Sequence, residues 1–146
     1  MKVPYLDLRI LDKTHKEALH KRLEAVLAHG RIIEGPEVQE FERRIAQRIG
    51  TRFAVGTGSG SSAIYMALKA LGIGRGDEVI TTPFTWIITV NAIAATGAKP
   101  VFADIKTDFN VDPKKIEKKI RPKTRAIVPM HVGGHLCEME FLEKLA

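Results

Sequence analysis

The sequence predicts an α/β protein in which a mostly parallel sheet is flanked by helices. Two observations predict this class. From residue 51 onward, short strand-like segments alternate with helical patterns, which is typical of βαβ units. Before residue 51, two amphipathic helical patterns follow one another with no strand between them. We therefore expect an N-terminal helical segment over residues 1–50 and an α/β domain over residues 51–146.

The two N-terminal helices are predicted over residues 13–29 and 36–49. Each carries an apolar stripe at helical spacing. The second has a proline in its first turn, and a glycine follows each helix, as is common at helix ends. The stripes consist of Leu19, Leu23, Val26 and Leu27 in the first helix and of Val38, Phe41, Ile45 and Ile49 in the second.

Four strands and four helices are predicted beyond residue 51. The strands are expected at residues 53–57, 78–82, 100–104 and 124–130, the first of them short and buried. The helices are expected at residues 61–71, 87–95, 112–120 and 138–146. The pattern at 87–95 is almost wholly apolar, so we expect that helix to be buried. The last pattern has no stop signal, so we expect these residues to be part of a longer protein.

A turn rich in glycine and serine, residues 56–63, lies between the first predicted strand and the next helix. Glycine lets the backbone adopt positive φ and approach a ligand closely. The free N–H groups and the dipole at a helix start favour an anion, and three serine hydroxyls add donors. The pattern favours a phosphate site over a plain turn with serine caps.

A dinucleotide site is the alternative interpretation of this turn. The spacing of Gly58, Gly60 and Ala63 fits the G-x-G-x-x-G/A pattern. That pattern also requires an acidic residue at the carboxyl end of the second strand, where Thr82 stands instead. Glu78 has a suitable sequence offset but lies at the opposite end of the strand. We therefore rank a Rossmann dinucleotide-binding domain below other phosphate ligands.

Charge and composition argue against several other classes. The formal net charge is +6, and the stretch 106–125 holds eight basic and three acidic residues. No aromatic side chains interleave with the basic residues of 114–125, so we interpret the stretch as a solvated face and expect no nucleic-acid partner. The five histidines and Cys137 lack the spacing of zinc ligands, so no metal site is expected.

Membrane association and secretion are not expected either. No stretch approaches 18 uninterrupted apolar residues, so no membrane span or membrane partner is predicted. The first residues lack the apolar core of a signal peptide. A single cysteine cannot form an intramolecular disulfide, which suits a reducing cytoplasm.

Seven segments of the sequence occur together, in this order, in one known family. They are residues 3–8, 35–42, 54–63, 67–80, 83–86, 97–102 and 122–131, among them G-P-E-V at 35–38 and G-I-G-R-G-D-E-V-I at 72–80. Together they resemble the DegT/DnrJ/EryC1/StrS family of sugar aminotransferases. The resemblance implies the N-terminal part of the large domain of a fold-type-I aminotransferase that uses pyridoxal 5′-phosphate (PLP). Residues 51–146 would then be an incomplete PLP-binding domain.

The resemblance also implies roles for particular residues. Gly60, Ser61 and Ser62 match the positions that bind the PLP phosphate. Trp86 matches the aromatic residue that stacks on the pyridine ring, and His131 matches a position near the substrate. The reaction implied moves an amino group from an amino acid such as glutamate to a keto-sugar nucleotide. The family is usually homodimeric, with active sites at the subunit boundary.

The sequence departs from the family pattern at several positions. Ser59 replaces an asparagine, Ser61 stands where threonine is common, and Gly133 and Gly134 replace tyrosine-glycine. The family's Schiff-base lysine and the aspartate at the pyridine nitrogen come after the matched segments. We therefore expect no catalytic residue and no activity from these 146 residues alone. A non-catalytic PLP-binding or dimerisation module is the alternative.

Overall fold

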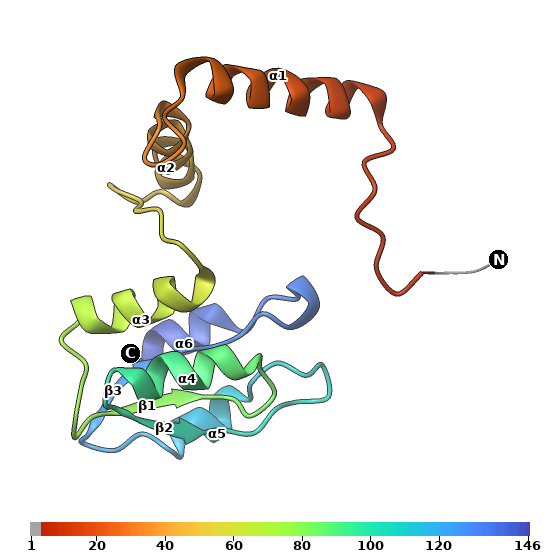
Figure 1. Cartoon of the computed structure of the whole chain (residues 1–146). Coiled ribbons are helices and arrows are strands. Elements are labelled where there is room, and N and C mark those ends of the chain that lie inside the picture. The colour runs from red at the N-terminus through yellow and green to blue at the C-terminus, as the bar shows by residue number, and fades with distance from the viewer. Residues whose placement is uncertain (1–3) are drawn as a thin grey trace. The chain divides into compact units, whose positions relative to one another are not determined.

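The structure is a computed structural model that describes residues 4–146, in two compact units. The first unit ends at Gly56 and the second runs from Thr57 to Ala146 (Figure 1). Val3, which opens the first family-like segment, lies outside the described residues. The domain boundary that the sequence predicts after residue 50 stays a prediction.

Two helices form the ordered part of the first unit, α1 (Lys13–His29) and α2 (Pro36–Ile49), with the bounds that the sequence predicts. Local signals explain this agreement. The Asp12 carboxylate accepts a hydrogen bond from the N–H of His15 at 2.6 Å and caps α1. Gly30, with φ 68°, ends the helix in the left-handed conformation that favours glycine.

Acid should weaken one ionic cluster on α2. Glu40 accepts hydrogen bonds from Arg43 at 2.7 Å and Arg44 at 2.6 Å, which lower the pKa of Glu40 from 4.5 to about 2. A depressed carboxyl pKa stabilises the fold above the unfolded pKa, and this contribution is lost as the pH falls through the folded pKa. We therefore expect an NMR titration midpoint for Glu40 near pH 2, and less stability lost on acidification in Glu40→Gln.

A matched control is available on α1. Glu24 is exposed and forms no ion pair within residues 4–146, so Glu24→Gln should leave the acid-induced loss of helicity unchanged. A Glu40 midpoint near 4.5, or equal acid sensitivity of the two variants, would show that the cluster is not formed in solution.

The second unit contains a parallel sheet in the order β2-β1-β3. The strands are β1 (Glu78–Thr81), β2 (Lys99–Phe102) and β3 (Thr124–Ile127). All pairings are parallel, which confirms the predicted α/β class. β3 ends earlier than predicted, because Pro129 has no N–H to donate to the ladder.

Two helical layers cover this sheet. The helices are α3 (Gly60–Ala70), α4 (Ile87–Ala95), α5 (Pro113–Glu117) and α6 (Met139–Leu145), and η1 (Val132–Gly134) is a single 3₁₀ turn. Successive strand residues point to opposite faces. Val79 packs in a core with residues of α3 and α4, whereas Ile80 packs in a second core with residues of α5 and α6. β1 is therefore shared by both cores.

Two predictions about elements need correction. Residues 53–57 form no strand, and Phe53 and Val55 are 72% and 75% exposed, so the prediction of a short buried strand is wrong. A strand needs a neighbour to accept its hydrogen bonds and cover its side chains, and within residues 4–146 the sheet contains only β1, β2 and β3. Helix α4 has the predicted bounds but is buried on one side only, since Ile87 is 60% exposed.

Candidate functional site

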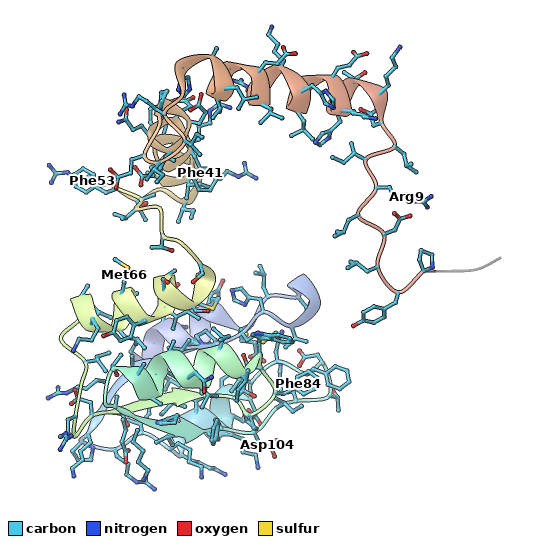
Figure 2. All side chains as sticks on the ribbon, in the orientation of Figure 1. Arg9, Phe41, Phe53, Met66, Phe84 and Asp104 are labelled. Carbon is cyan, nitrogen blue, oxygen red and sulfur yellow. The ribbon has the colours of Figure 1, made fainter. Side chains whose placement is uncertain are left out.

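The carboxyl ends of the three parallel strands meet at one edge of the sheet, where ligands bind in open α/β folds. Two loops meet at this edge, and Figure 2 labels Phe84 and Asp104 there. The rings of Phe84 and Phe109 stack with centroids 5.3 Å apart, which joins the loops after β1 and β2. The hydroxyl of Thr81 donates to the carbonyl of Val128 at 2.8 Å and ties the end of β1 to β3.

The first turn of α3 offers free donors. Ser59 caps the helix, because its hydroxyl accepts the N–H of Ser62 at 3.1 Å. The N–H of Ala63 makes the first helical bond, to the carbonyl of Ser59 at 3.0 Å. Within residues 4–146, the N–H groups of Gly60 and Ser61 have no acceptor. Two amides at the positive end of a helix can therefore receive the oxygens of an anion.

The predicted phosphate residues differ in their availability. The hydroxyl of Ser62 lies 3.0 Å from that of Ser59, and its N–H is also engaged, so Ser62 is mainly part of the cap. Ser61 makes no hydrogen bond through its side chain or its N–H within residues 4–146. The arrangement makes Gly60 and Ser61 the main donors for an anion.

A shallow cavity of about 280 Å³ lies on the surface of α3 and α4, next to these donors. Its lining comes from the first turns of α3 and from one face of α4: Ser61, Ser62, Tyr65, Ile88, Asn91, Ala92 and Ala95. Trp86 directly precedes α4, and its side chain is 74% exposed. The start of α3 therefore lies beside one face of α4, and the exposed indole of Trp86 has a flat face available for stacking.

His131 lies after β3, at the start of the loop formed by residues 131–137, hereafter the His131 loop. Its Nδ1 atom accepts a hydrogen bond from the N–H of Cys137 at 3.2 Å. When the ring is neutral, this bond places the proton on Nε2. The side chain is exposed, so the His131 loop presents an imidazole of defined tautomer.

Asn110 is a site residue that the sequence analysis missed. It is 1% exposed, and its amide bonds to three backbone groups of the His131 loop. A signal was present: an amide between the apolar residues Phe109 and Val111 is expected to be buried and must then be satisfied. Its partners, however, lie more than 20 residues away in sequence.

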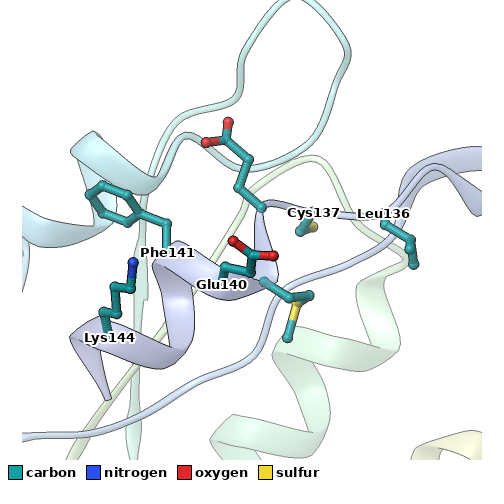
Figure 3. Close-up of a pocket in the computed structure, with 7 residues that line it drawn as sticks. Leu136, Cys137, Glu140, Phe141 and Lys144 are labelled. Atoms are coloured by element: carbon teal, nitrogen blue, oxygen red, sulfur yellow. The ribbon is translucent and has the colours of Figure 1, made fainter.

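Another cavity, of about 570 Å³, opens beside α6 and holds no predicted site residue (Figure 3). Cys137 forms part of its wall. Burial raises the pKa of the Cys137 thiol, and its Sγ donates to the carbonyl of Met130 at 3.2 Å. A thiol with a raised pKa is a poor nucleophile, so Cys137 is not a candidate catalytic residue.

Two further features bear on the class of protein. Among residues 4–146, no three His, Cys, Asp or Glu side chains gather as metal ligands would. Within the same residues, every helix is too short or too polar to span a bilayer.

Known proteins resemble this chain in sequence and in fold. The profile of the DegT/DnrJ/EryC1/StrS aminotransferase family matches residues 13–146. The chain belongs to this family. The predicted family and α/β class are thereby confirmed, and a Rossmann dinucleotide domain is not favoured.

Two curated relatives and one solved structure illustrate the likeness of this aminotransferase-family chain. The spore coat polysaccharide biosynthesis protein SpsC of Bacillus subtilis is 43% identical over 99% of the chain and 36% of its own length. The UDP-2-acetamido-2-deoxy-3-oxo-D-glucuronate aminotransferase of Pseudomonas aeruginosa is 36% identical over 99% of the chain and 40% of its own length. The crystal structure of NtdA from Bacillus subtilis with bound cofactor PMP has a TM-score of 0.91 at 35% identity, over 99% of the chain and 34% of its own. The chain thus spans well under half the length of these proteins.

Proposed function

We propose that the protein is a PLP-dependent aminotransferase that moves an amino group from an amino acid such as glutamate to a keto-sugar nucleotide. In this reaction the donor carbon becomes a ketone and the acceptor carbonyl becomes an amine. The observation that carries the proposal is the pair of free N–H groups at Gly60 and Ser61, on a capped helix start. The family match and the named activity of the Pseudomonas relative on a UDP-linked 3-oxo sugar support it.

The donor set fits the phosphate of PLP. A phosphate carries close to two negative charges and accepts several hydrogen bonds, and the amides of Gly60 and Ser61, with the Ser61 hydroxyl, supply donors at the positive end of α3. Ser62 would join them by exchanging its bond with Ser59. Trp86 would hold the pyridine ring by offset stacking. When bound, PLP supplies the electron sink for amino transfer, while these residues orient it.

The loop after β2 places Lys106 near the carboxyl edge of the sheet. This lysine is not suited to covalent catalysis. Hydrogen bonds to Glu138 and to Asp108, the latter at 3.3 Å, raise the pKa of Lys106 despite partial burial. The amine therefore stays protonated and is not a nucleophile. We propose that the Schiff-base lysine and the aspartate at the ring nitrogen lie outside the residues described, as the family resemblance implies.

We also propose a homodimer in the cytoplasm. The exposed apolar stripe of α1, which buries none of its residues, supports a partner subunit. The single cysteine, with a free thiol, supports a reducing compartment.

The fluorescence of Trp86, the sole tryptophan of these 146 residues, tests the cofactor site directly in this part of the protein. PLP is expected to quench the emission in a saturable manner. Pyridoxal, which lacks the phosphate, should bind at least about tenfold more weakly, because charged hydrogen bonds contribute about 1.5–3 kcal/mol. Trp86→Phe should lose the signal but retain binding in equilibrium dialysis. Equal quenching by pyridoxal would contradict the phosphate site.

A turnover assay then separates enzyme from binding module. The full-length protein, including the segment proposed to carry the Schiff-base lysine, is incubated with PLP, glutamate and a UDP-linked 3-oxo sugar, and the release of 2-oxoglutarate is followed. Release that depends on the sugar supports the aminotransferase. Phosphate-dependent PLP binding without release would support the non-catalytic module instead.

A further inference from the structure

A buried amide joins two loops at the carboxyl edge of the sheet. Asn110, in the loop after β2, donates through Nδ2 to the carbonyls of His135 at 3.1 Å and Leu136 at 3.2 Å. Its Oδ1 accepts the N–H of Val132 at 3.0 Å. Because two of these partners are acceptors and one is a donor, they determine the positions of the nitrogen and the oxygen of the Asn110 amide. One side chain therefore bonds to both ends of the His131 loop.

The conformation of the His131 loop depends on hydrogen bonds from a residue outside the loop. It contains one 3₁₀ turn and two consecutive glycines in the left-handed region, Gly133 at φ 61° and Gly134 at φ 83°. Glycine loses more conformational freedom on ordering than other residues. Closure of the loop also brings the N–H of Cys137 to Nδ1 of His131. The orientation of the imidazole is thus tied to the closed loop.

Other links between the two loops are weaker. The carboxylate of Asp108 lies 3.5 Å from Nε2 of His135, and Lys106 pairs with Glu138. These groups are partly or largely exposed, and exposed ion pairs contribute little. Removing the buried amide of Asn110, in contrast, would leave the three backbone groups that it bonds without a partner, which is costly. Asn110 is therefore the dominant connection.

We propose that Asn110 is a positioning residue that holds the His131 loop closed and thereby fixes the tautomer and orientation of His131 toward the amino acceptor. The part that concerns the acceptor rests on the proposed aminotransferase function. The part that concerns the loop stands on these hydrogen bonds alone.

Asn110→Ala tests the clamp against Ile93→Ala. Ile93 is fully buried in α4, but it packs in the other core, which within residues 4–146 contains no residue of the His131 loop. In Asn110→Ala, hydrogen exchange at the amide of Val132 should accelerate at least about tenfold. The ¹⁵N signals of His131 should also move from one tautomer toward a mixture. Ile93→Ala should lower the melting temperature and leave both signals unchanged.

The activity of the full-length protein, which includes the segment proposed to carry the Schiff-base lysine, tests the role of Asn110 toward the acceptor. In Asn110→Ala, the KM for a UDP-linked 3-oxo sugar should rise at least about fivefold, with kcat and the affinity for PLP changing less than about twofold. An unchanged KM in a variant with a loosened loop would overturn that role. Unchanged exchange at Val132 and an unchanged tautomer of His131 would overturn the clamp.

The failure of the proposed function is a separate result. If PLP does not quench Trp86 in the unmodified protein, the cofactor site is absent, and the exchange data for Val132 still decide whether Asn110 holds the loop.

Discussion

Replacing Ile80 by alanine is expected to lower the free energy of unfolding by about 2–5 kcal/mol, the usual cost of truncating a buried isoleucine. Ile80 is fully buried on the central strand β1. Its neighbours in the core all follow it in sequence: Ala103, Val111, Ile116, Cys137 and Leu142. Because α5 and α6 are short helices held mainly by this core, they cannot collapse onto the cavity without losing other contacts. Urea denaturation followed by circular dichroism measures the change.

Ile87→Ala is the matched control for this substitution. Ile87 begins α4 and is 60% exposed, so the same loss of atoms should cost less than about 1 kcal/mol. If the two variants were equally stable, β1 would not be the shared centre of the two cores.

Ser61→Asp is expected to weaken the binding of PLP by about 10- to 150-fold. The substitution removes a hydroxyl donor and places a carboxylate where the phosphate would bind. Losing one hydrogen bond to a charged group corresponds to about 1.5–3 kcal/mol. An acidic residue in the first turn of a helix is favourable for the helix itself. Binding should therefore fall while the melting temperature stays the same or rises, which excludes unfolding as the cause.

Ala70→Asp controls for charge alone. It adds the same charge to an exposed position at the opposite end of α3, and the affinity for PLP should stay within about twofold, since exposed charges beyond a Debye length are screened. Quenching of Trp86 by PLP measures both variants. Equal weakening by the two substitutions would contradict a phosphate site at the start of α3.

Elements with local signals could be predicted from the sequence. The bounds of α1, α2 and α4 agree with the prediction because caps, glycines and periodicity lie within the segments themselves. The segment 53–57 has the composition of a strand, but a strand exists only with a partner, and composition does not name one. This is why the prediction failed there.

The candidate site likewise contains residues with local sequence signals and a residue whose contacts are distant in sequence. The serine-glycine turn could be predicted because a capped helix start carries its donors in consecutive residues. The roles of Gly60, Ser61, Ser62, Trp86 and His131 stay predictions that the binding experiments test. The burial of Asn110 had a local signal, but its partners could not be predicted, because its hydrogen bonds reach the His131 loop across the whole of α5 and β3.

The position of β1 between two partners that follow it in sequence has a consequence for the order of folding. Glu78 pairs with Lys99 on one side and with Thr124 on the other. Closing the shorter loop costs less chain entropy than closing the longer one. The parallel β1–α4–β2 unit can therefore form as a nucleus, and β3 then docks on the free side of β1. Until that docking, the core around Ile80 is incomplete and the newly made chain exposes an open sheet edge, a state in which it is vulnerable to aggregation.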